Sequence, residues 1–188
     1  MPRRGTSFFV GGYYHIYNRG NNQEKIFFER ENYLFFLRQF RKYFARDAVE
    51  IVAYCLMPNH YHLLMHLKTD KLADLIQAFT LSYSKAINKR FNRVGSLFQG
   101  PFKVILIEKE DYLLQLSRYI HLNPVKAGLV AHADNWEFSS YRDYIGLRNG
   151  TLIVPDVVLA YVSAGQAYRE FVESSQEDRQ LVERLSFD

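Results

Sequence analysis

Two long segments of the chain repeat apolar residues every three or four positions, the pattern of an amphipathic helix packed on a core. We therefore predict helices over residues 30–46 and 70–92. Their apolar stripes consist of Tyr33, Phe36, Leu37, Phe40 and Phe44 in the first and Leu72, Leu75, Ile76, Phe79, Tyr83 and Ile87 in the second. A third helix is predicted over residues 110–123, ending near Pro124 because proline has no backbone N–H to donate.

Four shorter segments are rich in aromatic and β-branched residues, which is typical of strands. They cover residues 13–18, 50–56, 60–67 and 102–108. The order strand, helix, strand, strand, helix, strand is that of the ferredoxin-like split βαββαβ motif, an α+β fold with an antiparallel sheet. Both crossover helices lie on one face of such a sheet, so the other face is open for a site and for the third helix.

The periodic signal weakens beyond Gly128. We expect a short helical piece within residues 135–146 and one or two helices within residues 156–186. The chain is therefore interpreted as a main domain over residues 1–130, with a mainly helical C-terminal extension over residues 131–188 packed on the same domain.

The composition is that of a globular protein with a substantial core. Hydrophobic residues make up 48% of the 188 residues and aromatic residues 16%. Cys55 is the only cysteine, so no internal disulfide is possible. We find no signal peptide and no apolar run of membrane-spanning length, and expect a cytoplasmic protein without a membrane partner.

Charge is distributed unevenly along the chain. Residues 1–130 hold 19 basic and 10 acidic residues, whereas residues 131–188 hold 5 basic and 10 acidic ones. A basic body favours a polyanionic partner such as nucleic acid. The acidic extension is either a solvated appendage or a competitor of the polyanion that restrains the site.

His60 and His62 are separated by one residue in a predicted strand, so they share one face of it with Leu64 and His66. Two imidazoles at this spacing can bind one divalent ion, whereas His66 lies too far along the strand to join them. The alternative is a pair of ordinary hydrogen-bonded strand histidines. His15 is expected near this site, because the first strand neighbours the third.

Tyr119 and Asn123 lie one turn apart in the third predicted helix and therefore share a helical face. Asn123 offers an oxygen ligand suited to Mg²⁺ or Mn²⁺. Tyr119 offers a phenol that can act as a nucleophile. Periodicity alone also fits a plain core role for Tyr119, and an inward position is compatible with both interpretations.

Five blocks of the sequence together resemble one known family. In chain order they are "YHIYNRGNN", "MPNHYHLL", "GSLFQGPFK", "YIHLNPVKAGLV" and "WEFSSYRDYIG". "HYH" within the second is similar to the HUH motif, a pair of histidines around a bulky hydrophobic residue. The set resembles the REP-associated tyrosine transposases, a branch of the single-tyrosine, IS200-like HUH transposases that act on repetitive extragenic palindromic (REP) DNA.

The resemblance implies a catalytic HUH endonuclease fold over residues 1–130 and a role for each matching residue. It implies that His60, His62 and Asn123 bind a divalent ion, Mg²⁺ or Mn²⁺, and that Tyr119 is the nucleophile. The implied reaction cleaves and rejoins single-stranded or hairpin DNA through a 5′-phosphotyrosine. A nucleoid-associated monomer whose Tyr119 acts in its own site is favoured over a dimer.

Basic residues near these motifs are candidates for DNA contact. Spacings of three or four residues along the second helix give a basic ridge, although a solvated helix face has the same pattern. An N-terminal basic arm can enter a groove or be disordered. The candidates are Arg3, Arg4, Arg19, Lys85, Lys89, Arg90, Arg93, Lys103 and Arg118.

Two other functions fit the same residues. A domesticated transposase would bind palindromic DNA without cutting it. A metal-dependent phosphodiesterase would use water in place of Tyr119. The sequence leaves open the DNA target and guide, the choice between Mg²⁺ and Mn²⁺, and the role of the acidic extension.

Overall fold

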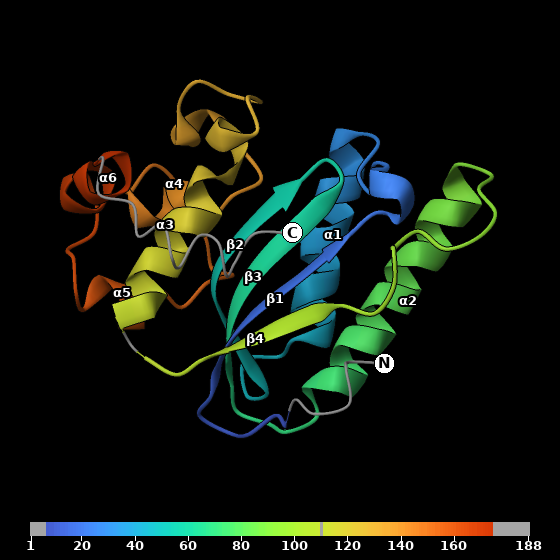
Figure 1. The fold of residues 1–188 in the computed structure, drawn as a ribbon, viewed down its shortest axis with the longest axis horizontal. Helices are drawn as coiled ribbons and strands as arrows, with labels where there is room; N and C mark the ends of the chain where they lie inside the picture. Colours follow the sequence, from blue (N-terminus) through green and yellow to red (C-terminus); the bar gives the residue numbers. More distant parts are fainter. Residues whose placement is uncertain (1–6, 110, 175–188) are drawn as a thin grey trace.

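The structure is a computed structural model that describes residues 7–109 and 111–174 (Figure 1). Four antiparallel strands form one sheet in the order β2-β3-β1-β4. Their bounds are β1 Tyr13–Arg19, β2 Val49–Met57, β3 His60–Leu67 and β4 Lys103–Ile107. This strand order is that of the ferredoxin-like motif, and the expected α+β fold is confirmed.

Helices α1 (Arg30–Tyr43) and α2 (Leu72–Arg90) pack together on one face of the sheet. The ring of Phe36 on α1 lies 5.2 Å from that of Tyr61 on β3 and 4.7 Å from that of Phe79 on α2, between centroids. All three side chains are fully buried. The predicted apolar stripes therefore face the core, although α1 ends three residues earlier than the predicted helix.

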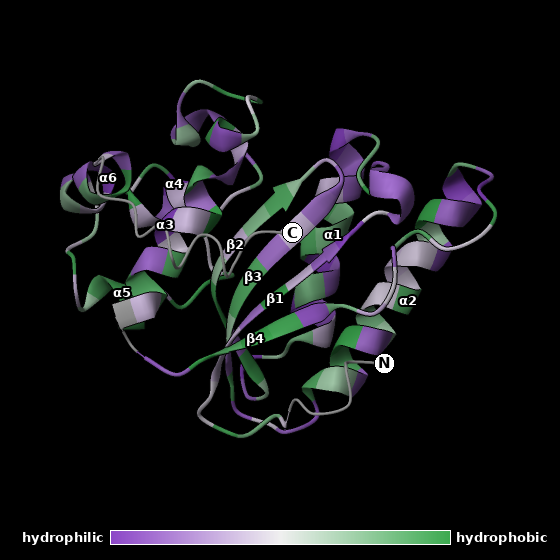
Figure 2. Ribbon diagram, in the orientation of Figure 1, coloured by the Kyte–Doolittle hydropathy of each residue, from purple (hydrophilic) through white to green (hydrophobic). Residues whose placement is uncertain are grey.

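The strand register determines which residues share the opposite face. Arg19 on β1 pairs with His60 on β3, and Tyr17 pairs with His62. Because Tyr61 points into the core, its neighbours His60 and His62 point to the other face. Figure 2 shows hydrophobic residues along much of the sheet and hydrophilic ones at the outer ends of α1 and α2.

Helix α3 (Asp111–Lys126) packs on this second face, against β2 and β3 (Figure 1). It ends at Lys126, three residues beyond the predicted end, so Pro124 lies inside its last turn. Proline lacks the N–H that would bond one turn back, and the helix continues only two residues beyond it. The side chain of Asn123 bonds the Tyr119 carbonyl oxygen at 2.9 Å in the same turn.

The extension folds against α3 and the edge strand β2. It contains the 3₁₀ helix η2 (Ala133–Asn135) and the helices α4 (Tyr141–Tyr144), α5 (Asp156–Leu159) and α6 (Gln166–Glu173). Backbone bridges join Ser139 to Cys55 and Ile153 to Ile51 on β2. The part of the predicted 156–186 helical segment that follows residue 174 lies outside the described residues.

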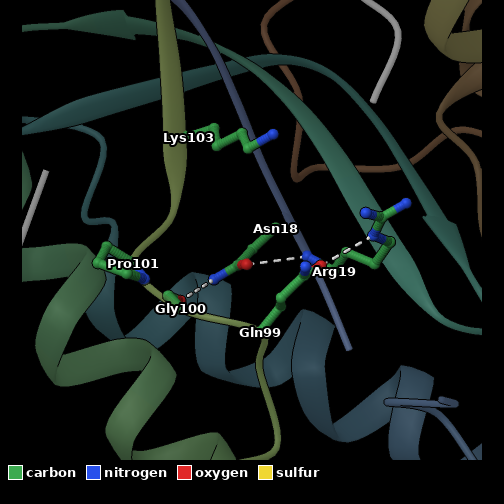
Figure 3. A pocket seen from close by; sticks show the side chains of 6 residues that line it. All are labelled: Asn18, Arg19, Gln99, Gly100, Pro101 and Lys103. Carbon is green, nitrogen blue, oxygen red and sulfur yellow. Dashed lines mark hydrogen bonds between the residues drawn. The ribbon is translucent and has the colours of Figure 1, made fainter. Parts of the chain in front are cut away.

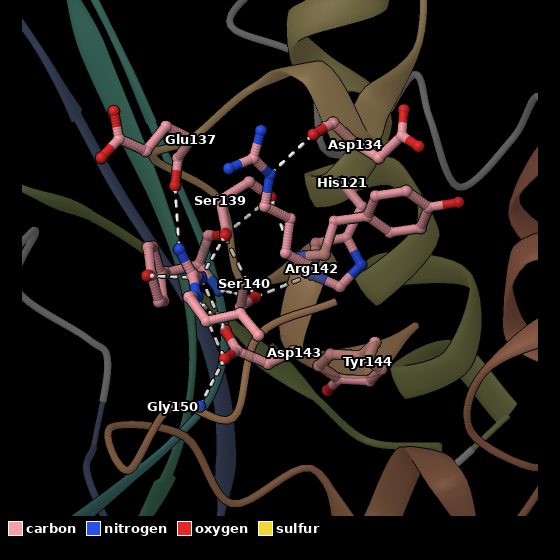
Figure 4. A network of polar contacts seen from close by, with 12 residues as sticks. His121, Asp134, Glu137, Ser139, Ser140, Arg142, Asp143, Tyr144 and Gly150 are labelled. Atoms are coloured by element: carbon pink, nitrogen blue, oxygen red, sulfur yellow. Dashed lines mark hydrogen bonds and ion pairs between the residues drawn. The ribbon is translucent and has the colours of Figure 1, made fainter. Parts of the chain in front are cut away.

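A buried polar network joins this extension to the sheet (Figure 4). The Ser140 hydroxyl accepts the Tyr54 backbone N–H at 2.9 Å, and Arg148 bonds Asp143, the Ser139 carbonyl and the Tyr54 hydroxyl. Among the helices of residues 7–109 and 111–174, none is long and apolar enough to cross a membrane.

Candidate metal and nucleophile site

His60 and His62 stand at the start of β3, with ring centroids 5.1 Å apart and ring planes at 89°. His62 is fully buried and His60 is half-buried. His66, further along β3, hydrogen-bonds Glu50 at 2.8 Å and stacks on Tyr13. The structure therefore separates His66 from the pair, as the spacing predicted.

A hydrogen bond fixes the orientation of the His60 ring. Its Nδ1 lies 2.7 Å from Oδ1 of Asn59, whose Nδ2 donates to the Gln23 carbonyl oxygen. Because Asn59 Oδ1 can only accept, Nδ1 of His60 carries the proton. Nε2 of His60 is left with its lone pair, which is the form that binds a metal.

His62 makes a similar contact with a residue of the neighbouring strand. Its Nδ1 lies 3.0 Å from Nε2 of His15, and both side chains are fully buried. The expectation that His15 lies near the pair agrees with this geometry. Asn59, by contrast, was not predicted, although it directly precedes the histidines in the sequence.

The surroundings keep all three imidazoles neutral. Burial lowers the pKa of His15 to about 3 and the pKa of His60 to about 4, where a side-chain hydrogen bond with Asn123 partly opposes it. The pKa of His62 lies well below its usual value through burial and through the nearby His15 and His60. Neutral imidazole is the metal-binding form, so the residues are ready to act as ligands at pH 7.

Tyr119 on α3 completes the cluster from the other side. Its ring is 5.4 Å from that of His62, edge to face, and its side chain is 8% exposed. Lys126, two turns further along α3, places its Nζ 5.5 Å from the same ring. The phenol is thus enclosed beside the histidines.

Asn123 lies one turn beyond Tyr119. Because its Nδ2 donates to the Tyr119 carbonyl oxygen, Oδ1 is the atom available to His60. The structure therefore brings together all four residues singled out for chemistry. In residues 7–109 and 111–174 no group of three or more His, Cys, Asp and Glu residues could hold a metal. An amide oxygen such as that of Asn123 is a ligand type suited to Mg²⁺ or Mn²⁺.

Comparison with known proteins identifies the family. Residues 9–123 match the family model described as transposase IS200 like. The chain belongs to this transposase family. A Haemophilus influenzae protein, whose name places it among the REP-associated tyrosine transposases, is 30% identical over 121 residues, which are 56% of this chain and 69% of that protein.

A solved structure also matches the transposase. It is that of a REP-associated tyrosine transposase bound to a REP hairpin, with a TM-score of 0.65 and 21% sequence identity. The match covers 81% of this chain and 88% of the other. The fold is therefore shared, and the resemblance drawn from the sequence blocks is confirmed.

Two of the DNA-contact candidates of the transposase border a cavity of about 220 Å³ beside the site (Figure 3). Arg19 is the strand partner of His60, and Lys103 begins β4. Gln99 holds Arg19 through a 3.1 Å hydrogen bond to its Nε. The cavity is lined by Asn18, Arg19, Gln99, Gly100, Pro101 and Lys103.

The ridge predicted on α2 is only partly formed. Lys85 lines a second cavity of about 580 Å³ that also borders Gly100, and Lys89 is exposed. Arg90 pairs with Glu29, while Arg93 follows the end of α2 and pairs with Glu24 at 3.2 Å. Arg93 therefore leaves the ridge, because the helix stops at Arg90. Arg3 and Arg4 lie outside the described residues.

Arg118 does not fit the DNA-contact role expected for it. Its side chain is 6% exposed, and it donates to the carbonyl oxygens of Val172 and Ser174 at the end of α6. The arginine binds orphan carbonyls at a helix C-terminus, where a cation is also favoured by the helix dipole. It ties α3 to the extension.

Proposed function

We propose that this transposase cleaves and rejoins single-stranded or hairpin DNA, of the REP palindrome type, through a 5′-phosphotyrosine on Tyr119. The observation that carries the proposal is the position of the Tyr119 ring, 5.4 Å from His62, with Asn123 beside His60 one turn away. The structural relative bound to a REP hairpin supports the substrate class. A DNA partner also favours a nucleoid location.

The donor set fits a hard or borderline divalent ion. Nε2 of His60, Nε2 of His62 and Oδ1 of Asn123 would hold Mg²⁺ or Mn²⁺, with positions left over for a phosphate oxygen and water. When bound, such an ion supplies a Lewis acid that polarises the scissile phosphate.

The chain's own residues would carry the covalent step. The Tyr119 oxygen attacks phosphorus and loses its proton, while the P–O3′ bond breaks and the 3′ oxygen leaves as a hydroxyl after taking up a proton. One phosphodiester is exchanged for another, so the step needs no energy source and is reversible. Attack by a free 3′ hydroxyl on the phosphotyrosine rejoins the strand.

Arg19 and Lys103 would guide the DNA into this site. Several acceptors that line their cavity are already occupied. Oε1 of Gln99 accepts from Nε of Arg19, Oδ1 of Asn18 accepts from the Arg19 backbone N–H, and the Gly100 carbonyl oxygen accepts from Nδ2 of Asn18. The cavity is therefore rich in hydrogen-bond donors. Donors match phosphate oxygens and the acceptor edge of guanine. Lys85 and Lys89 would extend the path along α2.

A covalent adduct tests the nucleophile. Incubation with Mn²⁺ and a single-stranded hairpin labelled at its 3′ end, downstream of the cleaved phosphate, should give a labelled protein band under denaturing conditions. Tyr119→Phe should abolish the band, and Tyr112→Phe, on the same helix, should retain it. An adduct unaffected by Tyr119→Phe contradicts the proposal. Hydrolysed ends without any adduct point to the phosphodiesterase, and tight binding without cleavage to the domesticated protein.

A mixing experiment tests action within one chain. Tyr119 already lies against His62 of the same molecule, so we propose that a monomer is sufficient. An equimolar mixture of Tyr119→Phe and His62→Ala proteins should then form no adduct. Adduct formation by the mixture, with neither protein active alone, would show instead that the tyrosine serves a partner's site.

A further inference from the structure

We propose that His15 is a positioning residue, which fixes the tautomer and the ring orientation of His62 so that Nε2 of His62 faces the metal. This inference rests on the proposed function. His15 Nε2 and His62 Nδ1 are 3.0 Å apart. The two rings are nearly parallel, at 15°, with centroids 5.2 Å apart, and both are fully buried.

The strand register explains how His15 reaches this position. His15 pairs with Leu64, and His62 pairs with Tyr17, so the two histidines are diagonal neighbours on adjacent strands. Diagonal residues on one face of an antiparallel pair are within reach of long side chains. The Tyr17 ring stacks on His15 with centroids 4.8 Å apart and restricts its rotation.

The chemistry of the contact selects one proton arrangement for metal binding. A bond between two neutral imidazoles needs one N–H donor and one lone-pair acceptor. If Nδ1 of His62 donates to His15, Nε2 of His62 keeps its lone pair. If Nε2 of His15 donates instead, the proton of His62 lies on its Nε2, and this atom cannot bind an ion.

The other nitrogen of His15 makes this arrangement adjustable. Nδ1 of His15 is buried and has no hydrogen-bond partner. No neighbouring group therefore dictates which nitrogen of His15 carries the proton, and His15 can act as the acceptor for His62. Ligation of one nitrogen of a histidine commonly depends on such a bond at the other nitrogen.

The arrangement can be observed directly in the unaltered protein. With ¹⁵N-labelled histidine, long-range ¹H–¹⁵N spectra distinguish the two tautomers of each ring. We expect His62 to carry its proton on Nδ1 when Mg²⁺ is present and His15 to accept it. A His62 ring protonated on Nε2 in the presence of Mg²⁺ overturns the proposal.

Metal affinity gives a second, independent test. Calorimetric titration with Mn²⁺ alone should show that His15→Phe, which keeps a ring but removes the acceptor, lowers the Mn²⁺ affinity by about 10–100-fold. His15→Gln, which restores an acceptor oxygen, should recover much of this loss. Tyr61→Phe is the matched control, because it removes a buried hydroxyl that has no partner from the core face of β3, the strand that carries His62.

The outcomes separate this inference from the proposed function. If His62→Ala abolishes Mn²⁺ binding while His15→Phe binds as well as the unaltered protein, His15 has no positioning role but the metal site stands. If His62→Ala leaves Mn²⁺ affinity unchanged, the metal site itself fails. Thermal unfolding of each variant without metal shows whether a loss reflects misfolding, and in that case the tautomer measurement decides.

Discussion

Gly20 directly follows β1, at a place where no side chain fits. Its N–H donates to the Asn59 carbonyl oxygen at 2.7 Å, and a Cβ there would lie 2.0 Å from the Glu24 carbonyl oxygen. Since that oxygen belongs to the backbone, the turn would have to move. Overpacking of this kind costs about 1–3 kcal/mol.

We therefore expect Gly20→Ala to lower the free energy of unfolding by about 1–3 kcal/mol, measured by urea denaturation. Because Asn59 also orients His60, Mn²⁺ affinity should fall as well. Gly100→Ala is the control, since a Cβ there meets no atom within 4 Å. Equal stability of the two variants would show that the 20–24 turn adapts freely.

At the level of single residues, the sequence indicated which side chains are candidates for chemistry, but it did not indicate what packs against each of them. Strand alternation placed His60 with His62, and helical spacing placed Tyr119 with Asn123, on shared faces. Their proposed roles came from the resemblance to the transposase family. Arg118 was misinterpreted, because helical spacing does not reveal what covers a face. Its cover is α6, some 50 residues further along the chain.

Among the elements, α3 depends on the extension for its position. The Tyr168 hydroxyl of α6 is buried and donates to the Ser117 hydroxyl at 2.8 Å, and it lies 2.7 Å from Nδ1 of His121. His121 also bonds the Ser140 hydroxyl at 2.8 Å (Figure 4). These contacts flank Tyr119 on the same helix, so the extension sets how α3 lies on the sheet.

Removal of the Tyr168 hydroxyl should destabilise the packing of α3 against the extension. Tyr168→Phe leaves two buried polar groups without their partner, which costs about 1–3 kcal/mol in unfolding free energy. Tyr141→Phe is a close control, because the Tyr141 hydroxyl is buried without a partner and its loss should be nearly neutral. If both substitutions cost the same, the network does not stabilise α3. Denaturant unfolding distinguishes the two results.

The periodicity of the sequence predicted the helices and strands of the main domain, but some of their first and last residues were placed incorrectly. The stripes of α1 and α2 and the alternation of β3 were strong signals. Pro124 gave a misleading one, because α3 includes this proline and ends two residues later, at Lys126. The short helices α4 and α5, of four residues each, span too little chain for a 3.6-residue period to be visible.

Over the whole molecule, basic residues lie at both ends of the sheet, and only one end holds the site. Lys85 and Lys103 border the two cavities that meet at Gly100. Arg41 and Lys42 are in the last turn of α1, which leads into the start of β2. The start of β2 is far from the site, because Val49 there pairs with Leu67, whereas Met57 at the other end of β2 pairs with His60. The two pairs carry equal charge at different distances from the site.

This difference predicts how DNA affinity depends on salt. Each cation that contacts a phosphate contributes about 0.7–0.9 to the slope of log affinity against log salt. The double substitution Lys85→Ala and Lys103→Ala should therefore reduce the slope for a REP-type hairpin by roughly 1.4–1.8, measured by fluorescence anisotropy between 50 and 200 mM salt. The matched double substitution Arg41→Ala and Lys42→Ala changes the net charge equally but should leave the slope nearly unchanged, since long-range attraction is screened beyond about 10 Å. Equal slopes for the two variants would mean that total charge, and not the surface beside the site, governs binding.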